Sequence, residues 1–287
     1  MTIRAATRGS TLARWQTAHV AALIAAANGS AVDAVIVSTA GDRDKTTPLH
    51  EIGGKGVFVK EVQAAVLDGR ADIAVHSAKD LPALTPDGLV ICAVPDRADA
   101  RDALVGCRLA NLPDGAKVGT GSIRRQVQLA AERPDVELVE IRGNIDTRLG
   151  RIGELDAVVM AAAALDRLGL TPAVVDRLDV STMLPQVGQG TLAIECRADD
   201  QQTLEALVSI DVADAHRVLD AERAFLVELD GDCDLPAGAY AELIDGDVRL
   251  RAMLSNGVDV IFTETRTGPD GALLGQALAV DLRDRLA

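Results

Sequence analysis

The chain has 287 residues, of which 48% are hydrophobic and 25% are charged, as expected for a soluble globular protein with more than one domain. Its formal net charge of −14 at pH 7 argues against binding to nucleic acid, which is also negatively charged. Only 2% of the residues are aromatic, which argues against rows of stacking rings on single-stranded nucleic acid.

The sequence indicates neither a membrane protein nor a metalloprotein. It has no run of 18 apolar residues, so no membrane span is expected. The N-terminal "MTIRAATR" lacks the apolar core of a signal peptide, so we expect a cytoplasmic protein. The four cysteines are widely spaced and the histidines form no H-E-x-x-H cluster, so neither a metal site nor a disulfide framework is indicated.

The first hundred residues alternate strand-like and helical runs, which predicts an α/β unit. Strands are predicted at Thr2–Ala6, Ala34–Ser38 and Asp72–Val75, and helices from Thr11 and over Phe58–Leu67. A polar stretch (41–48) and a glycine-rich stretch (53–56) precede the second helix. The periodicity of the first helix predicts one apolar face made of Leu12, Trp15, His19, Val20 and Leu23.

A second unit of the same kind begins near residue 100, with strands at Lys117–Gly119, Val136–Ile141 and Ala157–Met160 and a helix over Ser122–Ala131. Two of its stretches resemble stretches of the first unit. "ELDAVV" (154–159) resembles "RADIAV" (70–75), and "TGS" (120–122) lies at a strand-to-helix turn as "TRGS" (7–10) does. Two similar α/β lobes flanking a cleft would explain this, and chance similarity between α/β units is the alternative.

The last third has a different pattern. A helix is predicted over Ala215–Leu229 and another from about Leu273. Between them, Ile244–Asp247 and Ser255–Gly257 are hairpin signals. This pattern predicts a small α+β domain that starts near residue 213.

Several arginines stand beside predicted turns, where a helix N-terminus offers free N–H groups to an anion. Cations in a first helical turn oppose the helix dipole, so binding of anionic groups would give them a reason to be there. The alternative is surface pairing with some of the 43 acidic residues. As a set, these residues favour a polycarboxylate or phosphate site: Arg8, Arg124, Arg125, Arg142 and Arg148.

The stretch "AVHSAKDLP" places Lys79 and Asp80 directly after a predicted strand, where open α/β sheets bind ligands. Asp80 is a candidate acid/base or cation-stabilising group, and Lys79 a candidate anion-binding or Schiff-base group. A surface Lys–Asp pair is the alternative. His76 is expected to be a half-buried core histidine.

Taken in order, the motifs of nearly the whole chain resemble those of one family, porphobilinogen deaminase, also called hydroxymethylbilane synthase. The stretches that carry the resemblance are "ATRGSTLA" (6–13), "GGKGVFVKE" (53–61), "ADIAVHSAKDLP" (71–82), "RDALV" (101–105), "VGTGSIRRQ" (118–126), "IRGNIDTRL" (141–149), "LDRLGL" (165–170), "PQVGQGTLAIECR" (185–197), "AERAFL" (221–226) and "GDCDLPAGAYAEL" (231–243).

The resemblance implies a transferase that condenses four porphobilinogen molecules head to tail into the linear tetrapyrrole hydroxymethylbilane, with release of ammonia, in haem biosynthesis. It implies two α/β lobes similar to periplasmic binding proteins (1–95 with 190–210, and 98–186) and a small α+β domain (213–287). The last domain would carry a dipyrromethane cofactor, joined by a thioether to Cys233. Porphobilinogen is the expected partner, with neither membrane nor nucleic acid, and a monomer is expected.

Site roles follow from the resemblance residue by residue. Asp80 would be the catalytic carboxylate, which hydrogen-bonds pyrrole N–H groups and stabilises the cation formed as ammonia leaves. The cofactor-binding set would be Cys233, Lys79, Asp80, Ser122, Arg124, Arg125, Arg142, Gly143 and Arg148. The substrate-binding set would be Arg8, Ser10, Phe58, Arg142, Arg148 and Arg167. The sequence departs from the family's usual residues at Gly9, Ala78, Gly121, Asp232 and Asp234.

Cys233 lies between Asp232 and Asp234, and such negative neighbours raise the pKa of a thiol. One attachment to a strong electrophile does not require a poised thiolate, so the resemblance and this environment are compatible. Two alternatives stay open. A solute-binding or sensor module would explain the arginines without requiring Asp80 or Cys233, and a family member could have lost its activity.

Overall fold

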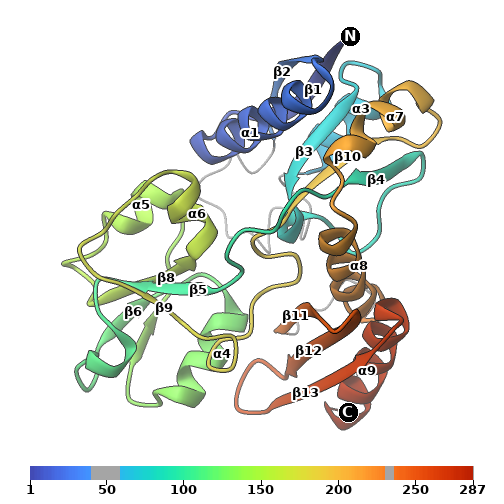
Figure 1. The fold of residues 1–287 in the computed structure, drawn as a ribbon. Coiled ribbons are helices and arrows are strands. Elements are labelled where there is room, and N and C mark those ends of the chain that lie inside the picture. Colours follow the sequence, from blue (N-terminus) through green and yellow to red (C-terminus); the bar gives the residue numbers. More distant parts are fainter. Residues whose placement is uncertain (40–58, 230–235, 287) are drawn as a thin grey trace. The chain divides into compact units, whose positions relative to one another are not determined.

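The structure, a computed structural model, describes residues 1–39, 59–229 and 236–286 (Figure 1). The chain divides into two compact units. The first comprises Met1–Arg97 and Thr191–Arg217, and the second Ala98–Gly190 and Val218–Ala287. Each unit has its own buried apolar clusters.

The first unit contains a five-stranded sheet of strand order β2-β1-β3-β10-β4. β1 pairs in parallel with β2 and β3, whereas β10 runs antiparallel to both β3 and β4. Helices α1 and α7 cover one face of the sheet and α3 covers the other. The elements are β1 (Thr2–Arg8), α1 (Thr11–Asn28), β2 (Ala31–Val37), α3 (Lys60–Leu67), β3 (Ile73–Ser77), η1 (Ala78–Asp80), β4 (Leu89–Ala93), β10 (Leu192–Arg197), α7 (Gln201–Leu207) and η3 (Val208–Ile210).

The predicted apolar face of α1 is wrong by part of a turn. Its buried residues are Gln16, Thr17, Val20 and Ile24, whereas His19 is exposed and stacks on Trp15 at a centroid distance of 5.0 Å. Gln16 and Thr17 are buried because they make polar contacts: Gln16 Nε2 donates to Ser77 Oγ (2.6 Å) and Thr17 Oγ1 donates to Ala13 O (3.1 Å). Apolar periodicity does not register such positions.

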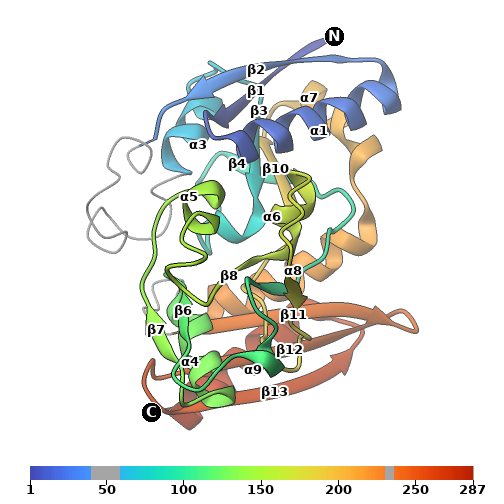
Figure 2. The same cartoon turned by 90° about the vertical axis from the view of Figure 1, so that its left-hand side faces the viewer.

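The second unit contains a sheet of the same design, with strand order β7-β6-β8-β5-β9, of which Figure 2 labels β6, β7 and β8. Here β6 pairs in parallel with β7 and β8, and β5 runs antiparallel to β8 and β9. Helix α4 packs on one face, and α5 and α6 pack on the other. The elements are β5 (Asp102–Val105), η2 (Leu109–Asn111), β6 (Lys117–Gly119), α4 (Ile123–Glu132), β7 (Glu137–Val139), α5 (Ile145–Leu149), β8 (Ala157–Ala161), α6 (Ala162–Arg167) and β9 (Val175–Arg177).

The two sheets explain the internal similarity of the sequence. β3 and β8, which begin within the two similar stretches, each occupy the middle place in their sheets. The aspartate before each strand makes the same contact with the neighbouring parallel strand. Asp72 Oδ2 accepts a hydrogen bond from Arg4 N, and Asp156 Oδ2 accepts one from Lys117 N, both at 2.8 Å. The two lobes therefore repeat one arrangement of strands.

The second unit also contains an antiparallel sheet of strand order β11-β12-β13, with α9 and the part of α8 from Val218 onward packed against it (Figure 1). The predicted hairpin turn joins β11 to β12, where Asp245 (φ 51°) and Gly246 (φ 89°) both adopt positive φ, as a type I′ turn requires. The elements are α8 (Ala213–Glu228), β11 (Ala237–Ile244), β12 (Asp247–Ser255), β13 (Ile261–Gly268) and α9 (Gly271–Leu286). The predicted fold class, α/β lobes with a small α+β portion, is confirmed.

Within the described residues, no helix combines the length and the apolar character that crossing a membrane would require.

Candidate functional site

A small pocket of about 50 Å³ lies in the first unit, at the carboxyl ends of β1 and β3. Three residues predicted to belong to the site, Arg8, Ser10 and Asp80, line it together. The other polar residues of its lining are Gln16, His76 and Ser77. The structure therefore brings together residues that are 70 positions apart in the sequence, at the sheet edge where ligands of α/β proteins bind.

Local structure explains how these side chains reach the pocket. Ser10 is the N-cap of α1, and its Oγ accepts a hydrogen bond from Ala13 N (3.3 Å). The turn η1 follows β3 directly and carries Lys79 and Asp80, while Ala78 is buried and its N donates to Thr191 O (3.0 Å). Asp80 is exposed, and its carboxylate has no hydrogen bond or ion pair with any other residue that the structure describes. That carboxylate is thus accessible to a ligand.

Behind the pocket lies a buried polar cluster of His76, Gln63 and Glu195. Glu195 on β10 is fully buried, and its two carboxylate oxygens accept from Gln63 Nε2 on α3 at 3.1 and 2.9 Å. His76 on β3 is 5% exposed, and its Nε2 lies 3.1 Å from Glu195 Oε2. The contact has the length of an ion pair but not the alignment of a hydrogen bond, so Nε2 has no aligned partner among the described residues.

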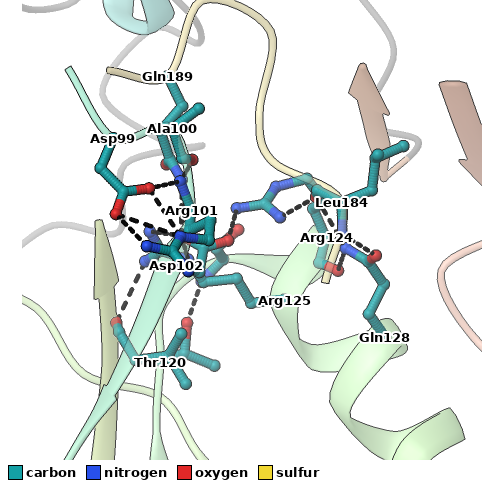
Figure 3. Close-up of polar contacts among 12 residues, drawn as sticks. Asp99, Ala100, Arg101, Asp102, Thr120, Arg124, Arg125, Gln128, Leu184 and Gln189 are labelled. Atoms are coloured by element: carbon teal, nitrogen blue, oxygen red, sulfur yellow. Dashed lines mark hydrogen bonds and ion pairs between the residues drawn. The ribbon is translucent and has the colours of Figure 1, made fainter. Parts of the chain in front are cut away.

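In the second unit, Arg124 and Arg125 point from the first turn of α4 to Asp102 on β5 (Figure 3). Arg124 Nη2 lies 2.8 Å from Asp102 Oδ2, and Arg125 Nη2 lies 2.7 Å from Oδ1. Gln189 Nε2 also donates to Oδ1 (2.8 Å). Both arginines are buried, at 5% and 6% exposure, and Asp102 is fully buried. These two arginines are therefore not solvated surface residues, although they do pair with an acid.

The trio of Arg124, Arg125 and Asp102 is unusual because it is buried and carries a net charge. Burial alone would raise the pKa of Asp102. The charges and hydrogen bonds of Arg124 and Arg125 lower it by more, so the net shift is downward and the carboxylate stays ionised. Burial lowers the pKa of Arg124, which has one carboxylate and one like-charged neighbour. Two guanidinium groups and one carboxylate leave one uncompensated positive charge. Arg124 Nε is also buried without a hydrogen-bond partner among the described residues.

The stretch "RGNIDTR" forms a capped turn that holds three predicted residues together. Asn144 caps α5, with its Oδ1 accepting from Thr147 N (2.9 Å). Arg148 Nε donates to Gly143 O (2.9 Å). Gly143 has φ +107°, and a Cβ there would lie 2.7 Å from Thr147 Cγ2, so the turn requires glycine. Arg142 and Arg148 are both partly exposed.

Two further predicted residues lie in the second unit. Ser122 is the N-cap residue of α4, and its side chain makes no capping hydrogen bond. Arg167, at the end of α6, donates from Nη2 to Gly190 O (2.7 Å). Burial lowers the pKa of Arg167 to about 10. Phe58 and Cys233, predicted to contact substrate and to anchor the cofactor, lie outside the described residues.

Gly9 and Gly121, two positions where the sequence departs from the family's usual residues, differ in their surroundings. A Cβ at Gly121 would lie 2.7 Å from Ile141 O, so the backbone leaves no room for a side chain there. A Cβ at Gly9 would meet only Ile36 Cγ2, at an ordinary 3.7 Å. Gly121 is therefore required by packing, whereas Gly9 is not.

The sequence reasoning missed that the acids Asp102 and Glu195 are buried. Each is a single acidic residue inside an apolar strand, in "RDALV" and "LAIECR", and such a residue must be paired when it is buried. A lone acidic residue within an apolar strand was therefore a signal that could have identified both. Within the described parts of the chain, no group of three or more histidine, cysteine, aspartate or glutamate residues is placed to hold a metal ion.

The chain is similar to several solved structures. One is the periplasmic aliphatic sulphonate binding protein SsuA from Escherichia coli, with 12% identity, coverage of 80% of this chain and 70% of that chain, and a TM-score of 0.42. Another is immunogenic lipoprotein A from Vibrio vulnificus, with 11% identity, coverage of 75% and 96%, and a TM-score of 0.44. A third is an ancestral cationic amino acid solute binding protein, with 17% identity, coverage of 72% and 86%, and a TM-score of 0.42.

Two family models match the chain in succession. Residues 3–205 match "Porphobilinogen deaminase, dipyromethane cofactor binding domain", and residues 217–284 match "Porphobilinogen deaminase, C-terminal domain". Together they cover nearly the whole sequence and include every predicted site residue. The chain therefore belongs to the porphobilinogen deaminase family.

Proposed function

We propose that the pocket around Asp80 is where this chain carries out the reaction of its family. The chain is a hydroxymethylbilane synthase, a transferase that condenses porphobilinogen molecules into hydroxymethylbilane, and its cofactor is dipyrromethane. The observation that supports the pocket is the meeting of Arg8, Ser10 and Asp80 at one sheet edge, although they come from distant stretches.

In this proposal Asp80 supplies negative charge where positive charge develops. Loss of ammonia from the aminomethyl group of porphobilinogen leaves a cation delocalised over the pyrrole, and a carboxylate close by stabilises that charge. The same oxygens accept hydrogen bonds from pyrrole N–H groups and hold a proton in transit. Arg8 and Ser10 complement Asp80, because a guanidinium and a hydroxyl suit the acetate and propionate groups of the substrate.

The donors of the second unit fit a cofactor that carries several carboxylates. The Arg124–Arg125–Asp102 trio has one uncompensated positive charge and a buried Nε without an aligned acceptor among the described residues. When bound, dipyrromethane supplies the ring to which the chain of pyrroles is added. The residues proposed to hold it are Lys79, Asp80, Ser122, Arg124, Arg125, Arg142, Gly143 and Arg148, with Cys233 as the covalent anchor.

The proposed substrate contacts are Arg8, Ser10, Phe58, Arg142, Arg148 and Arg167. We further propose a cytoplasmic monomer with lobes at 1–95 plus 190–210 and at 98–186, and a cofactor-carrying domain at 213–287. The oligomeric state is checked by light scattering on the purified chain. A mass near 30.0 kDa is expected, and twice that mass would contradict the monomer.

The function is tested by intact mass measurement together with porphobilinogen turnover. We expect the chain to carry an added mass of two pyrrole units that is lost in Cys233→Ser, and to convert porphobilinogen to a linear tetrapyrrole. The Cys107→Ser variant is the matched control and should keep the added mass. An unmodified chain without turnover would indicate a family member that has lost its activity or serves only to bind.

A further inference from the structure

The proposed function assigns no role to the buried pair of Glu195 and His76. We infer that His76, which lies beside the buried carboxylate of Glu195, is a second proton-carrying residue of the Asp80 pocket. This inference rests on the proposed function, because it assigns a role within the same site. It is carried by three observations: the burial of the pair, the position of the imidazole between Glu195 and the pocket, and the residue at the corresponding place in the other lobe.

Burial is the first observation. A fully buried carboxylate is costly unless it is paired and hydrogen-bonded. Gln63 gives Glu195 one amide nitrogen, shared between both oxygens at 3.1 and 2.9 Å. A neutral amide alone does not balance the charge. The imidazole, 3.1 Å away, is the group beside Glu195 that can take up a proton and balance it.

The orientation of the ring is the second observation. Nε2 is the nitrogen next to Glu195, and His76 also lines the pocket that contains Asp80. Nε2 lies beside Glu195, so we assign the pocket-side role to the other ring nitrogen, Nδ1. A carboxylate beside one nitrogen favours a proton on that nitrogen and leaves the other to accept one.

The second lobe supplies the third observation. When the similar stretches are matched at Asp72 and Asp156, His76 on β3 corresponds to Met160 on β8. Met160 is buried at 3% exposure in an apolar cluster. An apolar side chain therefore fills this place in the second lobe, and packing alone does not call for a histidine in the first.

The charges around His76 come from several elements. Glu195 on β10 lies beside it, and Asp80 on η1 and Arg8 at the end of β1 line the same pocket. On α3, the residue facing the cluster is the neutral Gln63, and Lys60 and Glu61 occupy less buried positions. The ring therefore lies between a buried carboxylate and a pocket that has one carboxylate and one guanidinium in its lining.

The reaction releases one proton inside the pocket, and a nearby group must accept it. The C–N bond of the protonated aminomethyl group breaks, and ammonia leaves with the electron pair. The new C–C bond then forms at a pyrrole carbon, whose C–H bond breaks and releases a proton. The ammonia that has already left takes up this proton last and becomes ammonium, so the balance closes. Asp80 and His76 together accept the proton from the carbon and carry it out of the pocket.

The test uses the purified, cofactor-carrying chain and the variants His76→Gln and Glu195→Gln. Removal of a general acid or base is expected to lower kcat about 10²-fold with little change in KM, and the pH dependence of kcat should change shape. His216→Gln is the matched control, because His216 also contacts a carboxylate in the same unit (Nδ1 to Asp211 Oδ1, 2.8 Å) but lies away from the pocket lining. Its kcat should equal that of the unmodified sequence.

A readout independent of activity is the ¹⁵N NMR spectrum of the ring nitrogens, in a chain with only four histidines. Glu195→Gln should change the tautomer or charge of His76 and leave His216 unaltered. An unchanged His76 signal, or folded variants that both turn over within twofold of the unmodified chain, would overturn the inference. If His76→Gln does not fold, Glu195→Gln and the NMR signal decide. An inactive unmodified chain without pyrrole modification refutes the proposed function itself, and this inference with it.

Discussion

The two lobes place a buried acid on the corresponding strand of the same sheet design but give it opposite partners. Glu195 lies on β10 and Asp102 on β5, and each strand is the antiparallel neighbour of the middle strand. Glu195 faces α3 and contacts an amide and an imidazole. Asp102 faces α4 and contacts two guanidinium groups.

This difference separates the chemistry that each lobe can support. Arginine keeps its charge at any ordinary pH, so the Asp102 cluster can hold an anion but cannot exchange protons. Histidine exchanges protons near neutral pH, so the Glu195 cluster can take part in proton transfer beside Asp80. One repeated arrangement of strands therefore supports carboxylate binding in one lobe and proton handling in the other, as we propose.

The largest expected effect on stability is that of Asp102→Asn. This change leaves two buried guanidinium groups without a compensating charge, which typically costs about 3–5 kcal/mol. Urea denaturation should show that loss in the free energy of unfolding. The exposed Asp199→Asn is the control and should stay within about 0.5 kcal/mol of the original chain. An equally small effect of Asp102→Asn would contradict the structural role of the cluster.

The stability difference between the original chain and Asp102→Asn is expected to depend on pH. The pKa of Asp102 is lower in the folded chain than its ordinary value of 3.8, so its contribution to stability is fully present above that value. As pH falls below 3.8 towards the folded pKa, the contribution is lost. The difference in unfolding free energy between the original chain and Asp102→Asn should thus be constant from pH 5 to 8 and shrink in stronger acid. A difference that grows in acid would contradict the ion pair.

A smaller effect is expected at the two strand-to-helix turns. Gly121→Ala should cost about 1–3 kcal/mol, because the added Cβ would lie 2.7 Å from Ile141 O. Gly9→Ala, at the corresponding turn of the first lobe, should stay within about 0.5 kcal/mol, since its Cβ has ordinary space. Thermal unfolding of both variants measures the difference. Equal melting temperatures would show that the two turns do not differ in packing.

Much of the fold was predictable because it depends on local patterns. The strand Lys117–Gly119 and the helix start at Thr11 have the predicted residues, and the strand of Ala157–Ala161 is one residue longer than predicted. Glycine marked the hairpins correctly, because Gly246 and Gly257 both adopt the positive φ that their turns require. The buried face of α1 was not predictable, since Gln16 and Thr17 are buried by polar partners rather than by apolar character.

The candidate site was predictable only in part. The motifs placed Arg8, Ser10 and Asp80 at strand ends, and the pocket brings them together. They did not show that Arg124 and Arg125 are buried on Asp102, because the partner lies 22 and 23 residues earlier on a separate strand. Likewise Glu195 is 119 positions from His76, and only the antiparallel pairing of β3 and β10 brings the two together.

The role of Asp80 is the central claim, and turnover of porphobilinogen by cofactor-loaded Asp80→Asn tests it most directly. Asp80 is exposed, so the variant should keep the original melting temperature while kcat falls about 10²–10⁴-fold. The exposed Asp87→Asn in the same unit is the control and should keep full activity. A near-normal rate in Asp80→Asn, with the pyrrole modification present, would contradict the account.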